Sequence, residues 1–169
     1  PVLWHGGQAL LVGRAMFKEE WHLRDLEHVD AEMEGVSDAL RGAGMRVEKL
    51  SGAAAQKDLV LARLSTAHVA HAATHSAHGG LILGGREVLT AEDIVGLELK
   101  TEVVVLSACH TMTDRSKTSD LVSGLSRALL AAGVRFVVAT LWKVSDRACC
   151  AFMRGFYAAW TQGDAVSEA

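Results

Sequence analysis

The 169-residue sequence has almost no proline, no excess of basic charge and no long apolar run. Its net charge of −3 provides no basic surface for a polyanion, so we expect no nucleic-acid partner. No stretch reaches the roughly 18 uninterrupted apolar residues that are typical of a membrane-spanning helix, so we expect no membrane partner either. The opening residues, PVLWHGGQ, also lack the basic start and apolar centre of a signal peptide.

Cysteine is scarce as well, and the sequence contains no glycine-rich phosphate loop. The three cysteines include the adjacent residues Cys149 and Cys150, which do not have the spacing of a disulfide framework. This cysteine usage favours a reducing compartment, so we expect a cytoplasmic location. Neither G-x-G-x-x-G nor G-K-S/T occurs, which disfavours a nucleotide-binding domain, and we expect no cofactor.

Strand-like and helix-like segments alternate along the chain, whose length suits one domain with a sizeable core. Apolar residues recur every three or four positions from Leu26 to Leu40, which predicts an amphipathic helix. The apolar runs EVVVLSA and FVVATL predict strands that are buried on both faces. The predicted strands cover residues 8–13, 45–50, 67–74, 102–109 and 134–142; the predicted helices cover 26–40, 54–65, 90–97, 119–133 and 145–160, with a hairpin at 81–89.

This alternation predicts an α/β fold with a mainly parallel sheet covered by helices on both faces. In such sheets, binding and catalytic sites form beyond the carboxyl ends of the strands. His75 follows the predicted strand 67–74, and Cys109 ends the predicted strand 102–109. The sheet is therefore expected to bring an imidazole and a thiol to the same edge.

In such a pair, the thiol can act as a nucleophile and the imidazole as its base. A free thiol has a pKa of about 8.5 and is mostly protonated at neutral pH. A nearby imidazole takes the proton or stabilises the thiolate, and peptide N–H groups beside the nucleophile stabilise an oxyanion. The alternative for Cys109 is a small buried residue, which is a common role of free cysteine.

Five segments of the sequence resemble the CHAT domains, members of the caspase–separase group of cysteine peptidases that often follow tetratricopeptide repeats. The segments are HAATHS (71–76), LTAEDIVGLEL (89–99), VVVLSACHT (103–111), LSRALLAAGVRFVVATLWKVSD (125–146) and FMRGFYAAW (152–160). The resemblance implies a caspase-like three-layer αβα sandwich. We expect residues 1–169 to form this one peptidase domain, as a fragment of a longer chain.

The resemblance also implies roles for individual residues. His75 would be the base and Cys109 the nucleophile of a dyad that cuts peptide bonds through a thioester intermediate. Ser76 stands where the family usually has a glycine whose backbone helps to form the oxyanion hole, and the loop that follows is short. These departures keep open the alternative of a catalytically inactive CHAT-type interaction module.

The stretch L-W-x-V-x-D, together with Ser76, supplies the candidate substrate-binding residues. Asp146 falls in the first turn of a predicted helix, where an acid is favourable to the helix dipole. In the separases that this stretch resembles, the pocket holds a basic residue before the cut bond, and Asp146 could form a wall of that pocket. Trp142 either lines the groove or packs in the core.

Four histidines lie within eleven positions of one another, at 68, 71, 75 and 78. Their spacing would suit a zinc site on a helix. A strand, however, directs His68 and His71 to opposite faces, so we expect no metal site. His71 is then a core residue with satisfied hydrogen bonds and His68 a surface residue at the strand start, while His78 is the alternative to His75 as the base.

The prediction from sequence is a cysteine endopeptidase domain regulated by other parts of the full-length protein. Its expected partners are a protein or peptide substrate and a tetratricopeptide-repeat region in the same chain or a partner chain. The rival predictions are the inactive interaction module and a small-molecule-binding α/β domain, the latter disfavoured by the missing phosphate loop.

Overall fold

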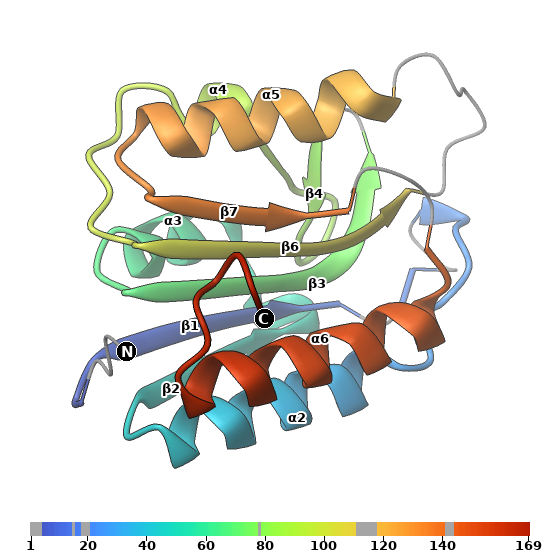
Figure 1. Cartoon of the computed structure of the whole chain (residues 1–169). Helices are drawn as coiled ribbons and strands as arrows, with labels where there is room; N and C mark the ends of the chain where they lie inside the picture. Colours follow the sequence, from blue (N-terminus) through green and yellow to red (C-terminus); the bar gives the residue numbers. More distant parts are fainter. Residues whose placement is uncertain (1–4, 15, 18–20, 78, 111–117, 141–143) are drawn as a thin grey trace.

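A computed structural model describes residues 5–14, 16–17, 21–77, 79–110, 118–140 and 144–169, with the backbone alone at 108–110 and 118–123. His78 and Trp142 lie outside the described residues. Figure 1 shows one twisted sheet with helices on both of its faces. No helix in the described part of the chain is long and apolar enough to cross a membrane.

The sheet contains five parallel strands and an antiparallel hairpin. The parallel strands are β1 (Gln8–Gly13), β2 (Arg46–Ser51), β3 (Val69–Ala77), β6 (Val103–His110) and β7 (Phe136–Ala139). They run side by side in the order β2-β1-β3-β6-β7. The hairpin of β4 (Gly80–Ile82) and β5 (Val88–Thr90) continues from the end of β3. This is the mainly parallel α/β sheet that the sequence predicts.

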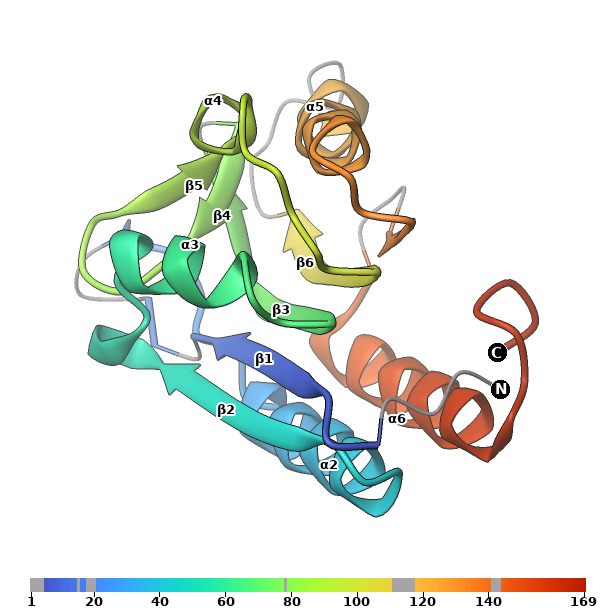
Figure 2. The ribbon, with the colours of Figure 1, turned by 90° about the vertical axis from the view of Figure 1, so that its left-hand side faces the viewer.

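Helices cover the two faces in separate layers (Figures 1 and 2). One layer consists of α2 (Val29–Gly42) and α6 (Asp146–Gln162), which pack against each other. The other contains α3 (Lys57–Leu64), α4 (Ala91–Ile94) and α5 (Thr118–Ala131), with the short 3₁₀ helix η1 (Gly52–Ala54) before α3. The three-layer α/β arrangement predicted from the sequence is thereby confirmed.

Local sequence explains where these helices begin. Helix α2 buries Val29, Met33, Val36 and Leu40, the apolar stripe that recurs every three or four residues. Helix α6 begins after Ser145, whose side chain accepts a hydrogen bond from the N–H of Ala148. Helix α4 begins with a capping box between Thr90 and Asp93.

The alternation of β3 divides the core into two parts. Val69 and Ala73 pack on the side of α2 and α6, whereas Ala70 and Ala72 pack on the side of α3 and α5. His71 and His75 have the same parity as Val69, so both belong to the α2–α6 side of the sheet.

Two strand predictions need correction. Strand β3 continues to Ala77, past the predicted end at Thr74, because Ser76 and Ala77 pair with the antiparallel strand β4. Strand β7 spans only residues 136–139, and the prediction that it is buried on both faces is wrong. Phe136 is 39% exposed, because β6 is the one strand that pairs with β7 in the described part of the chain.

Candidate active site

His75 and Cys109 occupy partnered positions on neighbouring strands. In the parallel register of β3 and β6, the Cα of His75 pairs with the Cα of Cys109, and that of Ser76 pairs with His110. Both positions lie near the carboxyl ends of their strands, the edge at which sites form in parallel sheets. The side chain of Cys109 is outside the described residues. The sheet thus brings the two candidate positions together through the backbone.

The His75 ring is buried and held on two sides. The residue is 1% exposed, and its Nε2 lies 2.7 Å from the carbonyl oxygen of Arg24. Because a carbonyl oxygen only accepts, Nε2 carries the proton in this hydrogen bond. The ring of Phe17 lies against the imidazole, with 4.4 Å between the ring centroids and a tilt of 58°. The imidazole therefore has a fixed tautomer and a fixed plane.

A cleft of about 590 Å³ opens beside His75. One wall comes from residues 22–28, which precede α2, and the other comes from residues 144–147, at the start of α6. Asp146 and His28 face each other across these walls: Asp146 Oδ2 accepts a 2.7 Å hydrogen bond from the N–H of His28 and lies 3.1 Å from its Nδ1. Two helix starts are thus joined at the rim of the cleft.

Asp146 lies both at a helix start and on the wall of the cleft. As the first residue of α6, it places a carboxylate in the positive field of that helix start. Through His28 it also binds the chain at the start of α2. It lines the same cleft as His75, with 22% of its side chain exposed. Its carboxylate is both a structural link and a charge on the wall of the cleft.

The other predicted substrate-binding residues differ in their placement. Ser76 is 6% exposed and lies within β3, with the opposite parity to His75. Its Cα pairs with Leu81 in β4 on one side and with His110 in β6 on the other. Ser76 is therefore a strand residue rather than part of a loop after the histidine. Trp142 is outside the described residues.

His71 is confirmed as a core residue with satisfied hydrogen bonds. It is fully buried, with Nε2 3.0 Å from the carboxylate of Glu32 in α2 and Nδ1 3.3 Å from the hydroxyl of Tyr157 in α6. Burial, and then the charge of Glu32, raise the pKa of Tyr157 well above its usual range. The phenol is therefore neutral and able to donate to Nδ1, while Nε2–H donates to the carboxylate.

This buried network connects both helices of one layer to the strand that carries His75. Glu32 was not singled out in the sequence, although it lies between Val29 and Val36 on the apolar side of α2. An acid on an apolar stripe is a signal that could have revealed it.

At the strand start, His68 is half-buried and its Nδ1 accepts a hydrogen bond from the N–H of Gln8. Within the described residues, no group of three or more potential metal ligands is present.

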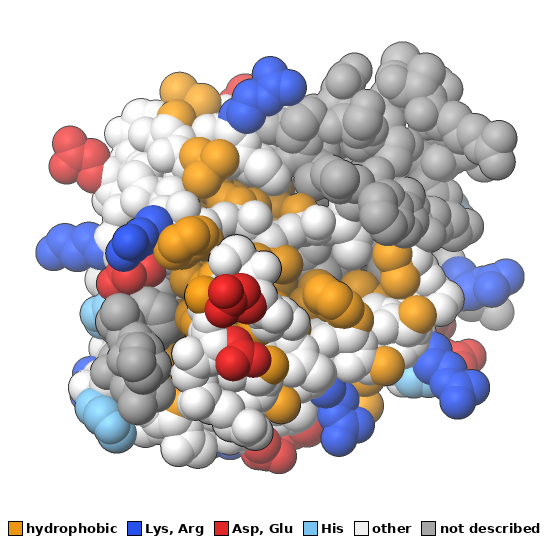
Figure 3. All heavy atoms as spheres, viewed as in Figure 1, with side chains coloured by type: hydrophobic (Ala, Val, Ile, Leu, Met, Phe, Trp, Pro, Cys, Tyr) orange, Lys and Arg blue, Asp and Glu red, His pale blue; other side chains and the backbone are white. Residues whose placement is uncertain are grey.

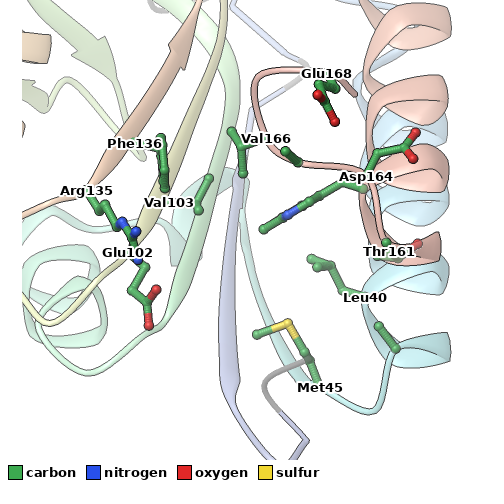
Figure 4. A pocket seen from close by; sticks show the side chains of 14 residues that line it. Leu40, Met45, Glu102, Val103, Arg135, Phe136, Thr161, Asp164, Val166 and Glu168 are labelled. Carbon is green, nitrogen blue, oxygen red and sulfur yellow. The ribbon is translucent and has the colours of Figure 1, made fainter. Parts of the chain in front are cut away.

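A second cavity of about 390 Å³ lies at the amino ends of β6 and β7, opposite the edge of the sheet that carries His75. Figure 4 shows Leu40, Met45, Val103 and Val166 around this cavity, beside the exposed ring of Phe136. Carboxylates of Glu102, Asp164 and Glu168 and the guanidinium of Arg135 lie on its margin. Figure 3 shows apolar side chains gathered on this side of the molecule, between charged ones.

The parallel order of the strands and the two layers of helices define an α/β three-layer domain. More particularly, the chain matches the family model of the CHAT domain over residues 4–169. The chain therefore belongs to the CHAT-domain family, a caspase-like, peptidase-related group.

Curated relatives agree with this family. The human tetratricopeptide repeat protein 28 is 37% identical over 82 residues, which is 48% of this chain and 3% of that protein. The mouse tetratricopeptide repeat protein 28 is 38% identical over 76 residues, 45% of this chain and again 3% of that protein. The matched segment is thus a small part of much longer relatives that contain tetratricopeptide repeats.

Among solved structures, a Streptococcus pneumonia TIGR4 flavodoxin is similar in fold, with a TM-score of 0.55. It is 14% identical in sequence, and the match covers 89% of this chain and 94% of that one. At this identity the likeness concerns the arrangement of strands and helices alone.

Proposed function

We propose that the chain is a cysteine endopeptidase domain in which Cys109 is the nucleophile and His75 its base. The observation that carries the proposal is the register of β3 and β6, which pairs the Cα atoms of these two residues at the carboxyl edge of the sheet. Family membership supports the same reaction class, because CHAT domains are related to cysteine peptidases.

The alternation of β6 supports the pairing. Val103 and Val105 pack on the α2–α6 side of the sheet, and Ser107 Oγ lies 3.1 Å from the sulfur of Cys149 in α6. Position 109 has the same parity as these residues, and His75 belongs to the same side. Positions 75 and 109 thus have matching parity on adjacent strands, which supports a proton transfer between an imidazole and a thiol.

The fixed tautomer of His75 determines which of its ring nitrogens acts as the base. Nε2–H donates to Arg24, so the neutral ring presents its lone pair at Nδ1. In the proposed reaction, Nδ1 takes the thiol proton, and the sulfur attacks the carbonyl carbon of the peptide bond. The imidazolium then returns the proton to the leaving amine as the C–N bond breaks, which leaves a thioester. Water, deprotonated by His75, hydrolyses the thioester and restores the thiol.

The cleft beside His75 is the proposed substrate site. Asp146 on its wall would attract a lysine or arginine before the cut bond, because a carboxylate in a partly enclosed cleft favours a cation. The role of Ser76 would be to offer its backbone near the oxyanion, and Trp142 would line the groove. A tetratricopeptide-repeat region in the same or a partner chain would select substrates, and the cytoplasm would be the compartment.

A second candidate function is an inactive CHAT-type interaction module. Two observations favour it: Ser76 replaces the family's usual glycine, and His75 is 1% exposed beneath Phe17 and Arg24. In this case the fold is retained as a binding domain while the reaction is lost.

Cleavage of a peptide library by the purified chain tests the two candidates. The unmodified chain, Cys109→Ala and His75→Ala are compared, with Cys150→Ala as the matched control because Cys150 lies on α6 and is not among the residues that line the cleft in the described chain. The peptidase predicts cleavage that both dyad substitutions abolish and the control retains. Absence of cleavage favours the interaction module, whereas cleavage that survives Cys109→Ala contradicts Cys109 as the nucleophile.

A further inference from the structure

Arg14 is a buried guanidinium held by backbone carbonyl groups. It follows β1 directly and is 7% exposed. Its Nη1 donates to the carbonyl oxygens of Leu83 and Gly85, and its Nε donates to that of Met16, 3.0 Å away. The planar fork of arginine makes such divergent bonds from one group, whereas a lysine ammonium cannot reproduce their geometry. Arg14 thus connects the β4–β5 turn to the segment that follows β1.

The same guanidinium begins a column of three side chains that ends at His75. The central carbon of the Arg14 guanidinium lies 5.2 Å from the centroid of the Phe17 ring, within the range of a cation–π contact. The Phe17 ring in turn lies 4.4 Å from the His75 ring. The backbone N–H of Arg14 donates to the carbonyl oxygen of Ala73, two residues before His75 in β3.

The acceptor of the His75 hydrogen bond depends on the same segment. The N–H of Phe17 donates to Asp25 Oδ1 at 2.6 Å, and Asp25 is the neighbour of Arg24, whose carbonyl oxygen binds Nε2. The indole N–H of Trp21 donates to the carbonyl oxygen of Gly85, which also accepts from Arg14. A shift of Arg14 would therefore disturb both the ring that packs on His75 and the carbonyl that fixes its tautomer.

We propose that Arg14 is a positioning residue for His75, which acts through Phe17 and residues 21–25 to hold the imidazole in its plane and in its Nε2–H tautomer. This inference rests on the proposed peptidase function for its kinetic consequence, but its structural consequence is independent of activity. Arg14 is not among the residues that line the cleft in the described chain, so it acts on the base and not on substrate binding.

The first experiment compares the unmodified chain with Arg14→Lys, which keeps the charge and removes the fork. Arg63→Lys is the control, because Arg63 pairs with Glu48 at the surface and is not among the described residues that line the cleft. Nitrogen-15 NMR of the imidazole should show a slowly exchanging Nε2–H for His75 in the unmodified and control chains. In Arg14→Lys this signal should be lost or mixed with the Nδ1–H tautomer while the other amide signals persist. An unchanged His75 signal in folded Arg14→Lys overturns the inference.

Kinetics supply the second readout. In Arg14→Lys, kcat should fall by about 10-fold to 100-fold, as for a base displaced by a fraction of an ångström, with KM within about 2-fold of the original. A change in KM alone would contradict a role through His75. If the unmodified chain cleaves nothing, the peptidase proposal fails while the NMR result still decides the positioning role.

A third measurement needs no substitution and applies even if Arg14→Lys does not fold. If the column moves as one unit, the Nε–H of Arg14, the backbone N–H of Phe17 and the Nε2–H of His75 exchange with solvent through one opening. Their protection factors should then agree within about 3-fold, as expected for a cooperative local unit. Protection of the His75 proton more than about 10-fold above that of the other two contradicts the inference.

Discussion

Asp146 and His28 lie at the starts of two packed helices and are joined through a single oxygen. Asp146 Oδ2 accepts from the backbone N–H of His28 at 2.7 Å and lies 3.1 Å from its ring Nδ1. Because α6 begins at Asp146 and α2 begins directly after His28, the pair joins the two walls of the cleft beside His75.

Asp146→Ala should destabilise the chain by about 1–2 kcal/mol, because it removes a charged acceptor from two helix starts. Asp146→Asn should have a smaller effect, since the amide oxygen still accepts from His28. Urea unfolding of the three chains measures the difference. Equal stability of Asp146→Ala and the unmodified chain would show that the observed hydrogen bonds contribute nothing in solution.

Selectivity at the cut site gives a second test of Asp146. Matched peptides with lysine, arginine or leucine before the cut bond should be cleaved with a preference for the basic residues of at least about 10-fold, as expected for a charge pair in a partly enclosed site. Asp146→Asn should remove most of this preference while it retains the fold. A preference that is absent at the outset, or unchanged by the substitution, would exclude Asp146 as the selecting residue.

The three cysteines should differ sharply in reactivity. Cys149 and Cys150 are buried in α6, and burial, followed by the charge of Glu32, raises the pKa of the Cys150 thiol. If His75 promotes ionisation of Cys109, brief treatment with iodoacetamide should label Cys109 at least about 10-fold faster than either. Peptide mapping measures the three rates, and His75→Ala should abolish the difference. Equal labelling of all three residues would argue against the dyad.

The buried pair of Glu32 and His71 should contribute far more than a surface pair on the same helix. Glu32→Ala leaves the buried Nε2–H of His71 without its acceptor and should cost about 1–3 kcal/mol. Glu34→Ala is the matched control, because Glu34 is exposed and pairs with Lys49 at the surface. Thermal unfolding should show a large fall for the first and little change for the second. Similar unfolding temperatures for the two variants would mean that the carboxylate of Glu32 contributes no more to stability than that of Glu34.

Acid should weaken the chain partly through Asp93. Burial alone would raise the pKa of this carboxyl, but hydrogen bonds from Thr90 and Lys57 outweigh it, so the pKa lies below its ordinary value of 3.8. A group whose pKa is lower in the folded chain stabilises it fully above the ordinary value. That stabilisation is lost as the pH falls through the folded-state pKa.

Asp93→Asn should therefore be less stable than the unmodified chain at neutral pH, and the difference should shrink below about pH 4. Urea unfolding at steps between about pH 7 and about pH 2 measures it, with the exposed residue Asp38, replaced by asparagine, as the control. A difference that stays constant with pH would show that the charge of Asp93 has no part in stability.

Short-range sequence patterns determined much of the secondary structure of this protein. The stripe from Leu26 to Leu40 and the cap at Ser145 correctly indicated two helices, because burial and capping act within a few residues. Alternating strands and helices correctly indicated the parallel sheet, since parallel strands need long crossovers. The five segments between His71 and Trp160 correctly indicated the family. The predicted end of β3 at Thr74 was wrong, because pairing with β4 extends the strand to Ala77.

Tertiary structure alone decided which groups meet. Nothing local to His75 indicates that the carbonyl of Arg24 binds its ring, or that Phe17 covers it, because both come from a segment some fifty residues earlier in the chain. The exposure of Phe136 could not be predicted from the sequence either, since the apolar character of a strand does not indicate whether another strand pairs with it. The spacing of apolar residues indicates which face of a helix or strand is buried. Which donor, ring or charge provides its surroundings depends on the packing of distant segments, and this packing is a property of the folded chain as a whole.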